Sequence, residues 1–226
     1  MTEMRTAATY PAAVIFDNDG VLVDSEPFVN RVLAVALAEA GLDMSPHEVE
    51  SQFLGGTLAT VRRWAKAERS IVLPPDFESR YNHQLMARLD GEFHAVRGVR
   101  PVLEELVNAG TEIGVASNSE RPWVLRALAV SGLDDLIPPD VIVTINDVKF
   151  GKPAPDVYLA AAARVGQPAG SCVAVDDSRP GIEAARRARM RTVGFAERTS
   201  RSALQAADAT VASMDTLLSA LQGVAQ

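Results

Sequence analysis

Short apolar runs, several rich in β-branched residues, alternate with longer amphipathic stretches along most of the chain. The apolar runs are AAVIF at 12–16, EIGVAS at 112–117, VIVTI at 141–145, CVAVD at 172–176 and TVGF at 192–195. Segments with helical periodicity lie between them, such as 99–110 and 155–166, each closed by a glycine. Strands and helices alternating at this spacing favour right-handed crossovers and a parallel sheet covered on both faces. The pattern predicts an α/β core with a doubly wound, Rossmann-like sheet.

One long stretch of the chain departs from this alternation. Residues 28–94 contain helical periodicity at 29–41 and 58–68, but no convincing strand. We therefore expect 28–94 to form an all-helical domain inserted into the core. The core would then consist of residues 1–27 and 95–226.

The overall charge limits the classes of partner. The chain has 226 residues and a formal net charge of −7, which opposes electrostatic capture of nucleic acid or an anionic membrane. No run of about 18 apolar residues occurs, and the first residues have no apolar stretch long enough for a signal peptide. We expect a cytoplasmic protein without a nucleic-acid or membrane partner. Cys172 lies in an apolar run and is expected to be a buried, inert thiol.

Polar residues that can carry chemistry follow the predicted strands. In an open parallel sheet, ligands bind outside the carboxyl ends of the strands, where neighbouring loops converge. The residues at these positions, or in the loop GKPAPD before the helix at 155–166, are Asp17, Asp19, Ser117, Asn118, Lys152, Asp176 and Asp177. We expect four carboxylates, an amine and a hydroxyl to share one crevice.

The first of these strand ends points to a metal and a phosphate. In extended chain, Asp17 and Asp19 project to the same side, and Gly20 then allows a sharp turn. Carboxylates this close, facing two more from the fourth strand, repel one another unless a proton or a cation is present. Oxygen-only ligands suit Mg²⁺, which also accepts a phosphate oxygen. Lys152, placed before Pro153 at a predicted helix start, would likewise be compensated by an anion.

Four motifs in this order resemble those of the haloacid dehalogenase (HAD) superfamily. They are DNDGVLVDSE from Asp17, ASNS from Ala116, GKPAPD from Gly151 and VDDSRPGIEAA from Val175. The spacing is similar to that of members with a helical C1-type cap, in the β-phosphoglucomutase and sugar-phosphatase branch. The resemblance implies that the helical insert is this cap.

The resemblance also implies a role for each motif residue. Asp17 would be the nucleophile that forms an aspartyl-phosphate, and Asp19 the general acid and then the base that activates water. Ser117, with Asn118 beside it, would bind the phosphoryl group, and Lys152 would offset its charge and hold Asp17. The implied Mg²⁺ ligands are Asp17, Asp177 and the Asp19 backbone carbonyl, with Asp176 acting mainly through a metal-bound water.

Departures from the family pattern favour one activity within it. Dehalogenase members lack an acid at the position of Asp19, so its presence favours phosphoryl chemistry. Mutase members similar to β-phosphoglucomutase carry a His and basic residues at positions that read here Val29, Leu54 and Leu58. Arg189 stands where the helix after the last motif usually ends in Gly, which leaves that helix end in question.

We therefore predict a Mg²⁺-dependent phosphatase of small organic phosphate monoesters, such as sugar phosphates. A sugar-phosphate mutase and a non-enzymatic phospho-accepting module remain alternatives. The expected partner is a small phosphorylated metabolite, and the expected state is a monomer or weak homodimer. The candidates for substrate selection in and beside the cap are Glu26, Gln52, Thr57 and Arg62.

Simpler interpretations apply to several of these residues taken singly. The sequence NDG is also a good hairpin turn. Ser117, Asn118 and Ser119 could merely cap the next helix. Trp64 and Trp123 are expected to be packing residues.

Overall fold

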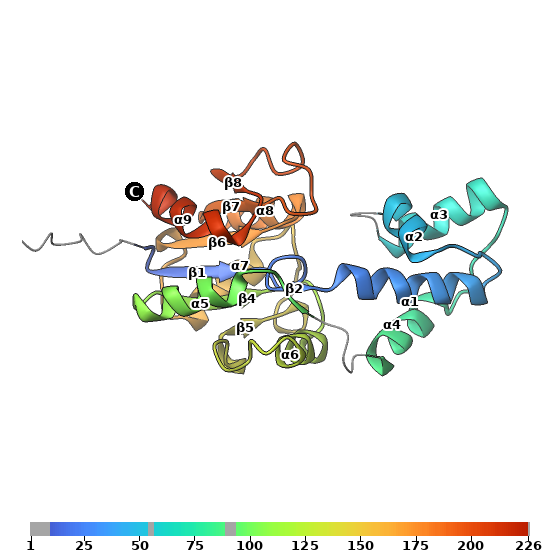
Figure 1. Cartoon of the computed structure of the whole chain (residues 1–226), viewed down its shortest axis with the longest axis horizontal. Helices are drawn as coiled ribbons and strands as arrows, with labels where there is room; N and C mark the ends of the chain where they lie inside the picture. Colours follow the sequence, from blue (N-terminus) through green and yellow to red (C-terminus); the bar gives the residue numbers. More distant parts are fainter. Residues whose placement is uncertain (1–9, 54–56, 89–93, 226) are drawn as a thin grey trace, which may run out of the picture. The chain divides into compact units, whose positions relative to one another are not determined.

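The chain forms two compact units, which Figure 1 shows in the colours of the sequence. The computed structural model describes residues 10–53, 57–88 and 94–225. One unit, the core unit, is Met1–Val23 with Ala95–Gln226, and the other, the helical unit, is Asp24–His94. The chain passes between them through β2 (Val23–Asp24) and β3 (His94–Ala95), which pair as a two-stranded sheet.

A six-stranded sheet organises the described part of the core unit, in the order β5-β4-β1-β6-β7-β8. Each neighbouring pair is parallel. The strands are β1 (Ala13–Phe16), β4 (Glu112–Ala116), β5 (Ile142–Val143), β6 (Cys172–Asp176), β7 (Arg191–Phe195) and β8 (Ala209–Val211). The sheet and the helices that cover it confirm the predicted doubly wound α/β fold.

Two strands differ from the prediction for identifiable reasons. Only two residues of the expected strand 141–145 pair in the sheet, because Thr144 leaves the strand to cap the turn Ile145–Asp147. Asp147 reaches back to both the amide and the hydroxyl of Thr144, at 2.8 and 2.9 Å. The three-residue β8 was not predicted at all.

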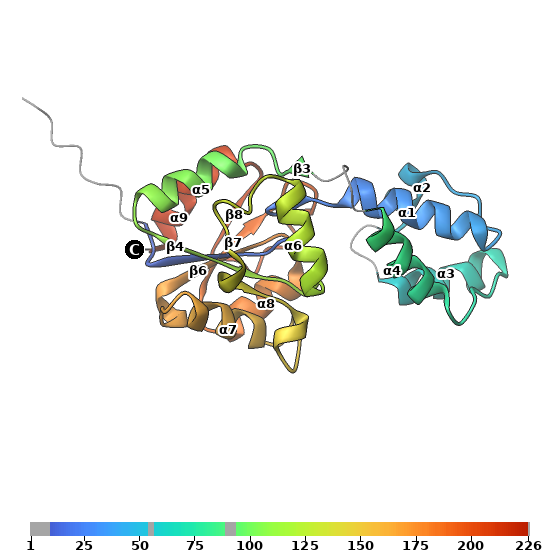
Figure 2. The same ribbon diagram turned by 90° about the horizontal axis from the view of Figure 1, so that it is seen from below.

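Helices cover both faces of this sheet. Figure 2 shows α5 and α9 on one side of it and α7 and α8 on the other. The core helices are α5 (Val99–Asn108), α6 (Arg121–Val130), α7 (Asp156–Arg164), α8 (Arg179–Arg187) and α9 (Leu217–Ala225), with short turns η1 (Pro139–Val141), η2 (Ile145–Asp147), η3 (Ala169–Ser171) and η4 (Met214–Thr216).

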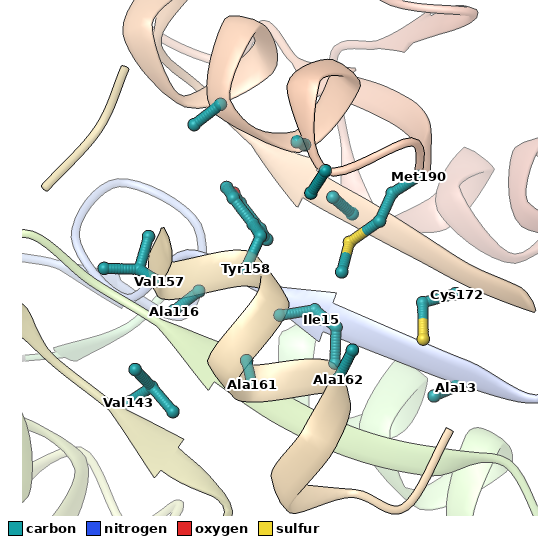
Figure 3. Close-up of a cluster of buried hydrophobic side chains, with 14 of the residues drawn as sticks. Ala13, Ile15, Ala116, Val143, Val157, Tyr158, Ala161, Ala162, Cys172 and Met190 are labelled. Atoms are coloured by element: carbon teal, nitrogen blue, oxygen red, sulfur yellow. The ribbon is translucent and has the colours of Figure 1, made fainter. Parts of the chain in front are cut away.

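Small side chains bring α7 close to the sheet. In Figure 3, Ala161 and Ala162 of α7 lie in the same buried cluster as Ile15 of β1, beside Val157 and Tyr158. All five side chains are at most 2% exposed. The close packing fixes the start of α7, and with it the loop that carries Lys152.

Arg189 lies just beyond the end of α8 in a left-handed conformation, with φ at 64°. The amide of the next residue, Met190, donates to the carbonyl of Ala185 at 3.0 Å. This is the backbone arrangement that glycine favours at a helix end. The helix therefore ends where a glycine was expected, although Arg occupies the position.

The helical unit consists of α1 (Glu26–Glu39), α2 (Pro46–Phe53), α3 (Leu58–Arg69) and α4 (Phe77–Ala87) in the residues described. The two segments with predicted helical periodicity fall on α1 and α3. His94, the last residue of the expected helical insert, is also the last residue of this unit and lies in the short strand β3. Within the described ranges, no helix combines the length and apolarity needed to cross a membrane.

Candidate active site

Three adjacent strands deliver the motif residues to one edge of the sheet. Phe16 at the end of β1 pairs with Val115 of β4 on one side and with Val175 of β6 on the other. The residues that continue these strands therefore emerge side by side at the carboxyl edge. The amide of Asp17 still donates to the carbonyl of Val175 at 2.9 Å, so the strand geometry extends to this carboxylate.

Lys152 bridges carboxylates from two of these strands. Its Nζ lies 2.9 Å from Oδ1 of Asp17 and 2.8 Å from Oδ2 of Asp176. The Lys152 side chain is 3% exposed and that of Asp176 is 0% exposed. A buried ammonium is costly unless it is paired, so the two carboxylates determine where this amine lies. The expected contact between Lys152 and Asp17 is present.

The Asp176 carboxylate accepts hydrogen bonds on both oxygens. Its Oδ2 accepts from Lys152 and, at 2.6 Å, from the hydroxyl of Tyr158. Its Oδ1 accepts from the amide and the hydroxyl of Ser178 at 2.8 and 2.7 Å. Gly181 in α8 leaves room for this carboxylate, because a Cβ there would lie 1.8 Å from Asp176 Oδ2. Asp176 is therefore well placed to position Lys152.

Gly20 allows the loop after β1 to approach Asp177. Gly20 has φ at 78°, and a Cβ built on it would lie 2.2 Å from Asp177 Oδ2. Both the backbone conformation and the available space therefore require glycine. Because Gly20 has no side chain, the loop that carries Asp17 and Asp19 can lie directly against Asp177 at the end of β6.

Three of these carboxylates can act together as metal ligands. Asp17, Asp176 and Asp177 each offer one carboxylate oxygen, and these three oxygens all lie within 4.8 Å of one another. Burial and the nearby charges of Asp176 and Asp19 raise the pKa of Asp17 to about 7, against the opposing effect of Lys152. Burial and the charges of Asp17 and Asp176 raise the pKa of Asp177 to about 8.

Three carboxylates face one ammonium in this cluster, so their combined negative charge exceeds what Lys152 alone can balance. Burial alone would lower the pKa of Lys152, but Asp17 and Asp176 outweigh it and raise that pKa above its ordinary value. The amine therefore stays charged, and the remaining charge favours a further cation. An oxygen-only, acidic set fits a hard divalent metal ion. Since both oxygens of Asp176 already accept hydrogen bonds, Asp17 and Asp177 are the better direct ligands.

Asp19 is held by two side chains from the segment after β4. Its Oδ2 accepts from the hydroxyl of Ser119 at 2.7 Å, and its Oδ1 accepts from Nε1 of Trp123 at 3.0 Å. The prediction that Trp123 is a packing residue is therefore incomplete. No local pattern could have revealed this bond, because the two residues are 104 positions apart.

Ser117 and Asn118 lie at the same edge but have different environments. Ser117 is 1% exposed, and its Oγ accepts from the amide of Ser119 at 2.9 Å. The Asn118 side chain binds the main chain of Lys152 twice: its Oδ1 accepts from the amide at 2.7 Å, and its Nδ2 donates to the carbonyl at 3.2 Å. Asn118 thus holds the lysine loop in place, which sequence reasoning missed.

The predicted substrate-selecting residues belong to the helical unit, and two of them have structural roles there. Arg62 donates to the main-chain carbonyls of Leu73, Pro74 and Pro75 at 2.8 to 3.2 Å. Arg62 therefore has a structural role in this unit, and its predicted part in substrate binding stays a prediction. Thr57 caps α3 in a reciprocal pair with Thr60, which accounts for its polar side chain.

The other two candidates lie on neighbouring helices of this unit. Glu26 is the first residue of α1, and Gln52 is exposed on α2. Leu54, which bore on the mutase alternative, lies outside the described residues.

Comparisons with known proteins identify the family of the chain. The family model described as haloacid dehalogenase-like hydrolase matches residues 14–195. Hexitol phosphatase B of Escherichia coli (strain K12) is 30% identical over 192 residues, covering 80% of this chain and 82% of that protein. Phosphoglycolate phosphatase of Yersinia pestis is 30% identical over 186 residues, covering 80% of this chain and 79% of that protein.

A solved structure shares the fold. A HAD family hydrolase from Deinococcus radiodurans R1, with bound phosphate and sodium, matches with a TM-score of 0.77 and 30% identity. The match covers 96% of this chain and 98% of that one. The chain therefore belongs to the haloacid dehalogenase-like hydrolase family. The predicted class, a HAD-type phosphatase, is confirmed at the level of the family and its named relatives.

Proposed function

We propose that this protein is a Mg²⁺-dependent phosphatase of small organic phosphate monoesters, acting through an aspartyl-phosphate on Asp17. The contact between Asp17 and Lys152, 2.9 Å apart at the carboxyl edge of the sheet, carries the proposal. A buried carboxylate beside a fixed ammonium, with further carboxylates in reach, suits the transfer of an anionic group.

The reaction has two halves. An oxygen of Asp17 attacks phosphorus, the bond from phosphorus to the ester oxygen breaks, and Asp19 gives its proton to the departing alkoxide. Asp19, now ionised, then takes a proton from water as that water attacks the aspartyl-phosphate. Inorganic phosphate leaves, Asp17 is regenerated as a carboxylate and Asp19 is protonated again. Splitting one displacement into two in this way is the usual benefit of a covalent intermediate.

The surrounding residues supply charge and orientation. Lys152 would neutralise part of the phosphoryl charge, and the Ser117 hydroxyl would bind a phosphoryl oxygen. A Mg²⁺ ion held by Asp17, Asp177 and the Asp19 carbonyl would supply further charge neutralisation and orient the phosphoryl group. Asp176 would position the Lys152 amine, and Asn118 would hold the main chain of Lys152 in place.

The relatives support a small substrate. Hexitol phosphatase B and phosphoglycolate phosphatase are named for phosphorylated metabolites of a few carbon atoms. We propose a substrate of this size, a sugar phosphate or a similar compound, selected by the helical unit acting as a cap.

A phosphate-release screen over phosphorylated metabolites tests the proposal. Wild type should release phosphate with Mg²⁺, lose activity with EDTA and regain it when Mg²⁺ is restored. Asp17→Asn should show only background release, whereas Asp134→Asn, at an exposed site in the same unit, should behave as wild type.

Two results would contradict the proposal. One is wild-type turnover in Asp17→Asn, and the other is transfer of phosphate between positions of a hexose phosphate without net release. The second result would instead support the mutase alternative.

A further inference from the structure

The Asp19 carboxylate receives hydrogen bonds from two chemically different donors. Ser119 Oγ lies 2.7 Å from Oδ2, and Trp123 Nε1 lies 3.0 Å from Oδ1. We infer that Trp123 and Ser119 are positioning residues that give the two oxygens of Asp19 different roles. Oδ2 releases and accepts the proton, and Oδ1 keeps the carboxyl group in a fixed orientation. This inference rests on the proposed role of Asp19 as acid and base.

The chemistry of the donors distinguishes the oxygens. An indole N–H can only donate, so Oδ1 cannot carry a proton towards Trp123 while that bond exists. A serine hydroxyl can donate or accept, and its hydrogen rotates. Ser119 can therefore donate to Oδ2 when Asp19 is ionised, and accept from it or release it when Asp19 is protonated.

The proton balance of both half-reactions is satisfied at Oδ2. In the first half, the Oδ2–H bond breaks and its proton goes to the ester oxygen as the bond from that oxygen to phosphorus breaks. In the second half, Oδ2 gains a proton from the attacking water. Oδ1 accepts from Trp123 throughout, so the carboxyl group keeps its orientation while its charge changes.

Further contacts within the core unit hold both donors in place. The amide of Ser119 donates to Ser117 Oγ at 2.9 Å, which ties it to the end of β4. Trp123 lies in the first turn of α6 and is 8% exposed. The start of that helix is fixed because the amide of Arg121 donates to Asn146 Oδ1 at 2.8 Å, and its guanidinium donates to the carbonyls of Pro139 and Ile142.

The second tryptophan of the chain provides a matched control. Trp64, in the helical unit, packs edge-on against Phe53 with ring centroids 5.2 Å apart, and Arg69 lies over its ring. Replacing either tryptophan by Phe removes one indole N–H and keeps an aromatic ring. Only Trp123→Phe removes the donor to Asp19.

The test compares kcat/KM for alkyl and aryl phosphates in wild type, Trp123→Phe, Ser119→Ala, Ser119→Thr and Trp64→Phe. This quantity reports steps up to release of the leaving group. An alkoxide needs a proton as it departs, whereas a good aryloxide leaving group needs little help. General acid catalysis raises a reaction rate by about 10²–10⁴-fold, so a misplaced acid should lose part of this rate enhancement.

We expect Trp123→Phe and Ser119→Ala to lower kcat/KM by about 10–100-fold for the alkyl phosphate but less than about 3-fold for the aryl phosphate. Ser119→Thr, which keeps the hydroxyl, should recover most of the alkyl activity, and Trp64→Phe should match wild type. An equal loss on both substrates, or no loss on the alkyl phosphate, would overturn the inference. Such a result, with Asp17→Asn still inactive, would leave the proposed function intact.

Discussion

Tyr158→Phe tests how the charged cluster contributes to the stability of the core. The change removes one oxygen, whose hydroxyl donates to Asp176 Oδ2 at 2.6 Å. Both side chains are fully buried, so water cannot replace the bond. The Asp176 carboxylate would keep its bonds to Lys152 and Ser178 but lose one of its two acceptor contacts on Oδ2.

The expected cost follows from the charge of the acceptor. A buried hydrogen bond to an ionised group contributes about 1.5–3 kcal/mol, roughly twice a neutral one. We therefore expect Tyr158→Phe to lower the free energy of unfolding of the core unit by about 1.5–3 kcal/mol. The aromatic ring remains, so loss of packing adds little.

Guanidinium unfolding followed by tryptophan fluorescence measures this quantity. The chain has two tryptophans, one in each unit, so a Trp64→Phe background leaves Trp123 as the single reporter of the core. Tyr10→Phe is the matched control, because its hydroxyl lies 3.5 Å from Glu105 at a more exposed position. If Tyr158→Phe lowers the free energy of unfolding by less than about 0.5 kcal/mol, which is the effect of an ordinary surface substitution, the reasoning is refuted.

Three further predictions concern backbone conformation and charge. Arg189→Gly should raise the free energy of unfolding by about 0.5–1 kcal/mol in denaturant titrations, because Gly adopts the left-handed conformation without strain; a loss of stability would contradict this. Gly20→Ala should abolish phosphatase activity and destabilise the core by about 2 kcal/mol or more, through contact with Asp177 as well as positive φ. Gly41→Ala, with φ at 85° and no atom within 4 Å, isolates the φ effect and should stay active. In EDTA, the free energy of unfolding should fall as pH rises from about 4 to 8. The raised pKa values of Asp17 and Asp177 mean that the folded chain binds more protons in this range than the unfolded chain does. A free energy of unfolding that does not change with pH, or that does not rise again when Mg²⁺ is added, would contradict the account.

The sequence predicted those parts of the fold that local pattern determines. The run CVAVD is the strand β6 to the residue, because five successive buried positions leave little freedom in register. The short β8 was missed because three residues, ATV, do not form a recognisable pattern. The early end of β5 depends on Asp147 bonding back to Thr144, a capping arrangement that overrode the apolar run.

The candidate site was predictable as a set of residues but not as a network of contacts. The order of the strands brings Asp17, Lys152 and Asp176 together, and the motifs named all three. Their partners come from elsewhere in the fold: Tyr158 reaches Asp176 from one helix, and Trp123 reaches Asp19 from another. A sequence pattern shows that an aromatic residue is buried, but it does not show where its polar atom points.

The polar residues of the helical insert were the hardest to interpret. Arg62 has the charge expected of an anion-binding residue, yet its guanidinium binds three main-chain carbonyls near Phe77. A long side chain on an exposed helix face can serve either purpose, and only its neighbours distinguish them.

Trapping the covalent intermediate tests the central claim most directly. The enzyme would be reduced with borohydride during steady turnover of an active phosphate monoester, digested, and analysed by peptide mass spectrometry. The account predicts that the carboxyl of Asp17 is converted to the alcohol of homoserine, only when substrate is present and not in Asp17→Asn. Reduction at another carboxylate, such as Asp19, or efficient phosphate release with no modification of Asp17 under any trapping condition, would contradict it.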